Sequence, residues 1–358
     1  MNRFMREKLS TVVKHAFQKL NHAPIPRRLH IDIAHDCNLN CFMCPRHLNK
    51  TEKKNMSLEE FSYIVRQFPI VNNIILQGTG ETFTNPYLFD ILATGGRRGM
   101  QFTITTNGTL LHEENVRRLS NVVNITVSID TACAQEYKRI RGADLNVVVG
   151  NLKRLKEIRN EIQINIQTII MEDNLDSLPQ MITLAQEIDA GQLNILHLEG
   201  FDQALAAKHA SLFTRSESIL TRTAELARTK GIRLVYPSLV PRLRGCFEPW
   251  FSPRISLSGD IYPCCYMYVS AQPTWRECYQ GLCMAVPQYQ YKMGNIFKDS
   301  FAKIWNDKDF RLLRKTVRES SKRFGMSALD LNKKRVEIDT ESRFSYCRVC
   351  LYKWDCAC

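Results

Sequence analysis

From residue 29 to residue 198 the chain alternates short apolar runs with amphipathic segments. The runs are rich in Ile, Val, Leu and Thr, and they predict six strands: 29–34, 73–77, 102–106, 123–129, 162–170 and 193–198. The segments between and beside them predict six helices: 57–68, 86–98, 111–120, two over 134–159, and 175–188. Such alternation is typical of a parallel sheet with right-handed crossovers. We therefore expect an α/β fold.

Residues with useful chemistry follow the ends of these predicted strands. They are Cys37, Cys41, Cys44, the stretch Gly78–Glu81, the pair Thr106 and Asn107, the stretch Ser128–Asp130, and Gln167. In parallel α/β folds the functional groups lie at the C-terminal ends of the strands. We therefore expect these residues to surround one site.

Three of the cysteines lie within eight residues, directly after the first predicted strand. Thiolates favour soft metals and iron–sulfur clusters. A closed structural zinc site needs four ligands, and after Cys44 the next candidate ligand is His47. Three thiolates on a [4Fe–4S] cube leave one iron open to another molecule. The alternatives at this point are a chance cysteine cluster and a zinc loop.

The spacing Cys37-x3-Cys41-x2-Cys44 resembles the signature of the radical SAM superfamily. The resemblance implies a partial (β/α)6 TIM-like barrel over 29–200 and a [4Fe–4S] cluster held by the three thiolates. It also implies that the open iron chelates S-adenosylmethionine (SAM). The cluster then gives one electron to the sulfonium, and a 5′-deoxyadenosyl radical is released. Met43 stands where many members have an aromatic residue.

Further segments resemble the family in the same order. The run Gln77–Glu81 resembles its GGE motif, which implies contact with the SAM amino group through Gly78, Thr79, Gly80 and Glu81. Ser128 and Asp130 would meet the ribose and carboxylate side of SAM, and Arg141 would pair with its carboxylate. Thr106, Asn107 and Gln167 complete the expected cofactor-binding set. The structural alternatives are an ordinary glycine turn and a surface cation at a helix end.

A second group of cysteines begins at Cys246. The pattern Cys246-x12-Gly259-x4-Cys264 resembles the opening of the SPASM and Twitch extensions of radical SAM enzymes, a small cysteine-rich α+β unit. Residues 253–263 predict a β-hairpin between the two cysteines, turning at 258–260. The run Gly294–Ile296, followed by a predicted helix over 300–318 that contains Trp305, also resembles that extension.

The tail reads Cys347-x2-Cys350-x5-Cys356-x-Cys358, with one residue in the last gap where a full SPASM domain has three. The resemblance implies at least one auxiliary [4Fe–4S] cluster, with Cys246 and Cys264 as ligands. Either Cys347 with Cys350 or Cys356 with Cys358 would complete the four. Further candidates are Cys265, Cys278 and Cys283. The rival interpretation is a zinc ribbon formed by Cys246, Cys264, Cys347 and Cys350.

The charge and the cysteine content limit the partners and the cellular location that we expect. The formal charge of +13 suggests nucleic acid as a partner, but thiolate ligands would offset part of it and the basic residues are scattered. We therefore expect no nucleic acid. Thirteen cysteines without an apolar signal segment or a bilayer-length apolar run indicate metal or redox cysteines in the cytoplasm.

The expected organisation has four parts. An amphipathic basic helix occupies 1–28 and packs over the barrel, or alternatively contacts an acidic surface or membrane. The barrel follows at 29–200, a linker helix (216–230) and strand (232–236) at 201–240, and the auxiliary cluster domain at 241–358.

The resemblance implies an oxidoreductase that abstracts hydrogen from its substrate, with a flavodoxin- or ferredoxin-type electron donor. Only 28 residues precede the first strand, few for a leader-binding domain, so a small or carbohydrate-like substrate is expected. A peptide or protein side chain is the alternative. From other classes, the alternatives are a zinc-stabilised nucleic-acid-binding protein and an electron carrier.

A two-electron oxidation also needs a base. Glu199 follows the sixth predicted strand, shares a strand face with His197, and is followed by Asp202. Glu199 is the first candidate base, with His197 and Asp202 next. The structural alternative is that Glu199 pairs with a neighbouring cation or positions SAM.

Overall fold

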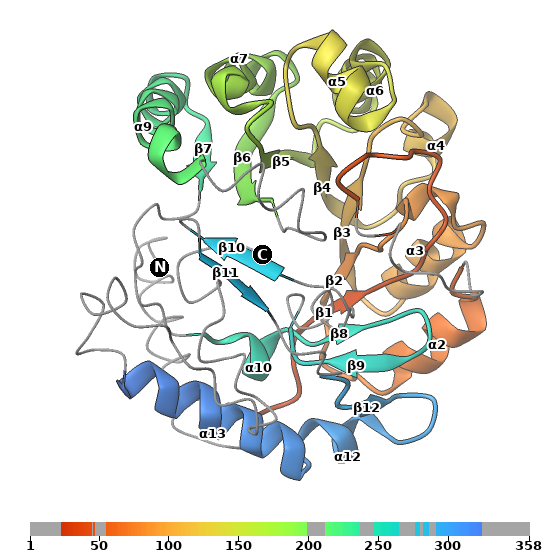
Figure 1. The fold of residues 1–358 in the computed structure, drawn as a ribbon. Coiled ribbons are helices and arrows are strands. Elements are labelled where there is room, and N and C mark those ends of the chain that lie inside the picture. Colours follow the sequence, from red (N-terminus) through yellow and green to blue (C-terminus); the bar gives the residue numbers. More distant parts are fainter. Residues whose placement is uncertain are drawn as a thin grey trace, which may run out of the picture.

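A computed structural model describes residues 23–44, 46, 55–198, 212–236, 246–264, 276–279, 282–285 and 291–323 (Figure 1). The helix predicted near the N-terminus, Glu199, Asp202, Cys265 and the four tail cysteines lie outside these residues. Within the described residues, no helix is both long enough and apolar enough to cross a membrane.

One curved sheet organises the described chain, and helices cover its outer side (Figure 1). Seven neighbouring strands pair in parallel. They are β1 (Arg28–Ile31), β2 (Asn73–Leu76), β3 (Gln101–Thr106), β4 (Val122–Ser128), β5 (Gln163–Ile170), β6 (Ala190–His197) and β7 (Arg233–Val235). This confirms the α/β class and the partial TIM-like barrel.

The sheet continues past β1 into the C-terminal part of the chain. Strand β8 (Arg254–Ile255) pairs in parallel with β1, and β9 (Asp260–Tyr262) and β12 (Gly294–Asn295) extend it antiparallel. The hairpin predicted over 253–263 is formed by β8 and β9. A separate antiparallel pair consists of β10 (Arg276–Tyr279) and β11 (Leu282–Ala285).

The helices follow the predicted order, with different bounds at several places. They are α2 (Leu58–Arg66), α3 (Leu88–Gly96), α4 (Glu113–Arg117), α5 (Ala134–Arg141), α6 (Leu145–Ile158), α7 (Leu178–Glu187), α9 (Leu212–Thr229), α10 (Glu248–Phe251), α12 (Phe301–Trp305) and α13 (Lys308–Arg323), with short 3-10 turns η2 (Thr82–Thr84) and η3 (Leu175–Ser177). The capping box at Ser57 and Glu60 is present, with both reciprocal hydrogen bonds.

Two predicted bounds were wrong, each for a local reason. The first strand ends at Ile31 rather than at residue 34, and Ala34 instead makes an isolated bridge with Asn55. The single helix predicted over 300–318 is two helices, because the Asp307 carboxylate accepts from the Phe310 N–H and begins α13. The helix and the strand predicted within 201–240 are present as α9 and β7, and β7 covers the open edge of β6.

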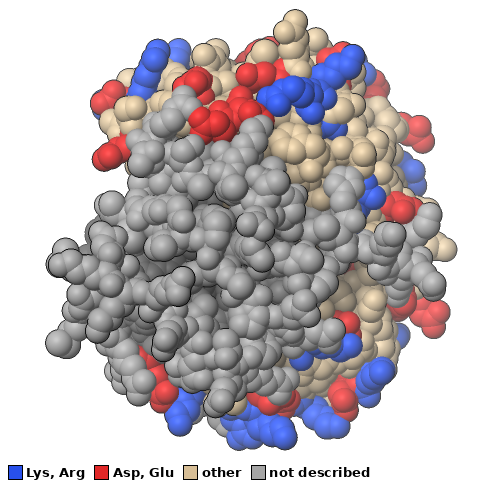
Figure 2. Space-filling model, viewed as in Figure 1, with Lys and Arg blue, Asp and Glu red and all other residues tan. Residues whose placement is uncertain are grey.

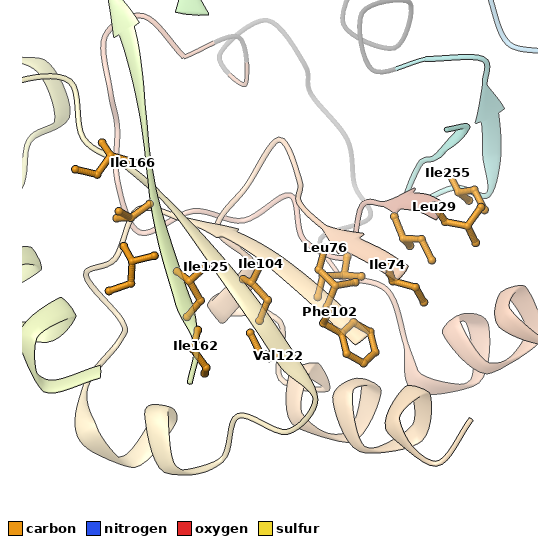
Figure 3. Packing of buried hydrophobic residues seen from close by; sticks show 14 of the residues in the cluster. Leu29, Ile74, Leu76, Phe102, Ile104, Val122, Ile125, Ile162, Ile166 and Ile255 are labelled. Atoms are coloured by element: carbon orange, nitrogen blue, oxygen red, sulfur yellow. The ribbon is translucent and has the colours of Figure 1, made fainter. Parts of the chain in front are cut away.

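The core lies between the sheet and its helices. Alternate strand residues point toward the helices and are buried, as Figure 3 shows for Leu29, Ile74, Leu76, Phe102, Ile104, Val122, Ile125, Ile162, Ile166 and Ile255. Burying a side chain of this size contributes about 1.5–3 kcal/mol. Because side chains alternate along a strand, the residues between these face the inner side of the sheet.

Candidate metal centre

The loop with Cys37, Cys41 and Cys44 leaves β1 and contacts the C-terminal end of α5. The Phe42 N–H donates to the Ile140 carbonyl over 3.3 Å, and the Cys41 thiol donates to the Arg141 carbonyl over 3.8 Å. Cys41 and Met43 form a small buried cluster with Ile140 and Met171. The predicted triad therefore lies where β1, β5 and α5 end.

The three thiols are close enough to influence one another's ionisation. Burial, with smaller contributions from the charges of Cys44, Asp130 and Cys37, raises the pKa of Cys41 to about 11. Burial also raises the pKa of Cys37, and Cys44 contributes to the rise. The free thiols of Cys37 and Cys41 are neutral, and a metal that binds them must displace their protons. Arg141 opposes the rise at Cys41 and Arg46 opposes it at Cys37, so two cations favour the thiolate forms.

The donor chemistry of the three thiols fits a cluster. Among the described residues, no three His, Cys, Asp or Glu side chains are close enough to share one metal ion. A [4Fe–4S] cube binds each thiolate at a different iron, so its ligands stand farther apart than the ligands of a single ion. Three converging thiols with nearby cations therefore fit the cluster that the sequence predicts.

The loop after β2 packs directly on the residues that lead into the triad. The Gly80 N–H donates to the Ala34 carbonyl (3.2 Å), and the Glu81 N–H donates to the Asp36 carbonyl (2.8 Å). A Cβ on Gly78 would lie 2.2 Å from the Ala34 oxygen, and one on Gly80 would lie 2.2 Å from the Asp36 oxygen. Both positions require glycine because two backbones touch there.

We expect Gly80→Ala to destabilise the fold by about 1–3 kcal/mol and to lower the iron content, because backbone atoms at 35–36 cannot move without moving the triad. Gly150→Ala is the matched control, since a Cβ there meets no atom within 4 Å inside α6. That change should stabilise by about 0.5–1 kcal/mol. Urea unfolding and iron analysis of both variants measure the two effects. Equal stability and iron content in Gly80→Ala and wild type would contradict this account.

Glu81 connects the β2 loop to the end of β3. Its buried carboxylate accepts from the Thr106 hydroxyl (2.7 Å), the Asn107 N–H (2.7 Å) and the Phe83 N–H (3.2 Å). Burial raises the pKa of Glu81, and these hydrogen bonds limit the rise. Glu81 is predicted to contact the SAM amino group, but most of the hydrogen-bond acceptor capacity of its carboxylate is used inside the protein. Thr79, in the same loop, shares a 2.9 Å hydrogen bond with His35.

Asn107 brings the end of β3 to the triad. Its side-chain amide donates to the Asn38 side chain over 2.9 Å and toward the Cys37 sulfur over 3.9 Å. Asn107 is nearly buried, so these contacts fix it beside the first cysteine.

A buried ion pair joins the end of β4 to the end of α5. Arg141 Nε donates to Asp130 Oδ2 over 2.7 Å, and the other Asp130 oxygen accepts from the Ile169 N–H over 2.9 Å. Burial lowers the pKa of Arg141, but the hydrogen-bonded Asp130 carboxylate together with Cys41 and Tyr137 outweighs that effect, and the net shift is upward. No hydrogen bond joins the two Nη groups of Arg141 to a described residue. Asp130 therefore holds the Arg141 guanidinium through Nε, and the charge of Arg141 acts on Cys41 of the triad.

Ser128 and Gln167 are register partners at the ends of β4 and β5. Both lie between residues whose side chains point to the helices, so both face the inner side, half-buried. Of the candidate bases, His197 ends β6 opposite Ile170, and its side chain lies outside the described part.

The first two cysteines predicted to bind an auxiliary cluster flank the β8–β9 hairpin. Cys246 and Cys264 are both half-buried and pack against the main core. On the separate strand pair, Cys278 and Cys283 are register partners.

Sequence reasoning missed a polar group on the inner face where β1 meets β8. The Arg254 guanidinium pairs with Asp32 over 2.6 Å, both side chains being buried, and His30 shares a 3.1 Å hydrogen bond with Gln77. Burial and the charges of Arg254 and Arg28 lower the pKa of His30 to about 3. The signal was present, because His30 and Asp32 are polar residues alternating with apolar ones in the first strand.

Two family models match the chain. The radical SAM superfamily matches residues 31–185, and an iron-sulfur cluster-binding domain, SPASM, matches residues 246–351. Among curated proteins, the AdoMet-dependent heme synthase of Methanosarcina barkeri is 23% identical over 81% of this chain and 85% of its own. The PqqA peptide cyclase of Gluconobacter oxydans is 25% identical over 67% and 70%.

Solved structures share the fold. Streptococcus suis SuiB bound to the precursor peptide SuiA has a TM-score of 0.64 at 16% identity, covering 86% of this chain and 71% of that one. SuiB has also been solved with S-adenosylmethionine. The two family models show that the chain belongs to the radical SAM superfamily and carries a C-terminal SPASM domain.

Proposed function

We propose that this radical SAM enzyme oxidises or cross-links a side chain of a peptide or protein. The observation that carries the chemistry is the convergence of three thiols, the Asn107 amide and the Arg141 guanidinium at one end of the sheet. When bound, the [4Fe–4S] cluster and SAM supply the one-electron cleavage that makes hydrogen abstraction available. Cys37, Cys41 and Cys44 would hold that cluster, and the Nη edge of Arg141 would bind the SAM carboxylate.

The side chains on the inner face of the sheet favour a neutral substrate that forms hydrogen bonds. One row of register partners across four strands consists of Thr105, Thr126, Asn165 and Gln192. A second row consists of Ser128, Gln167 and Asn194. All seven side chains are neutral, and each offers hydroxyl or amide groups. Peptide groups and sugar hydroxyls both suit such rows. The names of two relatives, a peptide cyclase and a protein solved with its precursor peptide, favour the peptide. A small carbohydrate-like molecule is the second candidate.

The oxidation also needs an acceptor for one electron and a base for one proton. An auxiliary [4Fe–4S] cluster would supply the electron acceptor, with Cys246 and Cys264 and two of the four tail cysteines as its ligands. Glu199 is our first candidate for the base, ahead of His197 and Asp202. A flavodoxin- or ferredoxin-type donor in a reducing cytoplasm would supply the first electron.

On this proposal, a short peptide encoded beside this gene and deuterated in its side chains should transfer deuterium to 5′-deoxyadenosine. The peptide itself should lose two hydrogens, and mass spectrometry of both products measures the transfer. Unlabelled 5′-deoxyadenosine from the peptide, with labelled 5′-deoxyadenosine from a deuterated aminocyclitol, would reject the peptide and support the small substrate.

In the same assay, Glu199→Gln should still cleave SAM but form product at least ~100-fold more slowly. Normal product formation by that variant would remove Glu199 from the mechanism.

A further inference from the structure

Tyr137 carries a buried hydroxyl for which the described residues provide no partner. It lies on α5, one turn before Arg141, and its side chain has no exposed surface. Its hydroxyl oxygen makes no hydrogen bond with any residue of the described part. The large majority of buried polar side-chain atoms in folded proteins have a partner, so an orphaned hydroxyl indicates an acceptor that the protein chain alone does not supply.

The groups that act on this hydroxyl belong to the metal centre. Arg141, Asp130, Cys41 and Glu81 all influence its ionisation. Burial is the largest influence and raises the pKa of Tyr137 to about 12, so the phenol stays neutral and keeps its proton to donate. Both Asp130 oxygens already accept hydrogen bonds, and Glu81 already accepts three.

Among these groups, Cys41 is the one whose sulfur becomes a new hydrogen-bond acceptor when the cluster is bound. As a free thiol it donates to the Arg141 carbonyl, and as a cluster ligand it becomes a thiolate. Helix α5 sets the distance between the two residues, because Ile140 and Arg141 contact the triad loop and Tyr137 lies on the same helix. Once the cluster is bound, the Tyr137 hydroxyl on this helix has a new anionic acceptor nearby, the Cys41 thiolate.

We propose that the Tyr137 hydroxyl donates a hydrogen bond to the Cys41 sulfur when that sulfur is a cluster ligand. This inference rests on the proposed assignment of the triad as the cluster site. Hydrogen bonds to cluster sulfurs help to set the reduction potential. Such a bond withdraws electron density from the sulfur and favours the reduced cluster, so its role is to tune the cluster that must be reduced before SAM is cleaved.

The test is Tyr137→Phe, which removes the hydroxyl and keeps the ring. The matched control is Tyr291→Phe, because Tyr291 is also buried but lies beside β12. EPR-monitored redox titration without SAM should give Tyr137→Phe a more negative potential for the triad cluster, with wild-type iron content. The signal that remains after Cys37, Cys41 and Cys44 are replaced by alanine identifies the auxiliary cluster, and is subtracted. Tyr291→Phe should leave the potential of the triad cluster unchanged.

SAM affinity, measured on the same proteins, separates the alternatives. An unchanged potential with weakened SAM binding would assign the hydroxyl to the SAM carboxylate and overturn the proposal. No change in either quantity would also overturn it, because the acceptor would then be water. Resonance Raman spectra of the wild type in H2O and D2O need no variant. The Fe–S bands of the triad cluster should move on deuteration, and unmoved bands contradict the proposal. Wild-type protein without a triad cluster would instead defeat the proposed function itself.

Discussion

Replacing Cys37, Cys41 and Cys44 together with alanine is expected to abolish SAM cleavage. Anaerobically purified wild type should contain about eight irons in two [4Fe–4S] clusters, and the triple variant about four. The reason is that no other described cysteine lies in the loop between β1 and α2 or in the small cluster around Cys41. Iron analysis and chromatography of 5′-deoxyadenosine, with dithionite as reductant, measure both losses.

Cys133→Ala is the matched control for that experiment. Cys133 is an exposed free cysteine just before α5, so its loss changes the thiol count without touching the triad. It should keep both the iron content and the SAM cleavage of the wild type. Formation of 5′-deoxyadenosine by the triple variant would refute the assignment of the triad.

Much of the barrel could be predicted because its signals are local. The parallel strands are buried on the helix side, so they show β-branched and apolar residues at a period of two. The capping box at Ser57 needs only residues three apart. Cys37, Cys41 and Cys44 are likewise close in sequence, so their spacing alone indicated a cluster.

The remaining features depend on partners that are distant in sequence. Asp32 and Arg254 come from strands joined only when β8 pairs with β1, and no local pattern indicates that pairing. The same holds for Gly80, where sequence predicts a flexible turn or approach to a ligand, and contact with Asp36 is visible only in the folded chain. Asp130 likewise has partners that no local pattern indicates, because its two oxygens accept from Arg141 on α5 and from Ile169 on β5.

The Asp130–Arg141 pair provides the second large prediction. Removing one partner of a buried ion pair leaves an uncompensated charge, which typically costs about 3–5 kcal/mol. We expect Arg141→Met to show a loss of this size in urea unfolding, because Asp130 is fully buried and would keep only the Ile169 N–H. The double variant Asp130→Asn/Arg141→Met should lose less than the sum of the two single variants, since no isolated charge remains.

Lys153→Met is the matched control for a surface ion pair. Lys153 lies 2.7 Å from Glu187, but the two side chains are 46% and 49% exposed, so water screens their attraction. Its unfolding should differ little from that of the wild type. A loss of stability as large as that of Arg141→Met would show that the buried position of the Asp130 pair is not the cause.

SAM binding separates the structural role of Arg141 from its proposed contact with the ligand. A hydrogen bond to a charged group contributes about 1.5–3 kcal/mol, so Arg141→Met should weaken SAM binding by roughly 10- to 100-fold. The triad cluster should remain, because Cys41 contacts the backbone of residue 141 rather than its side chain. Arg141→Lys keeps a positive charge but lacks the fork that holds Asp130 on one side and a carboxylate on the other. It should therefore recover part of the stability and little of the SAM affinity. Wild-type SAM affinity in both variants, at full iron content, would assign Arg141 to the fold alone.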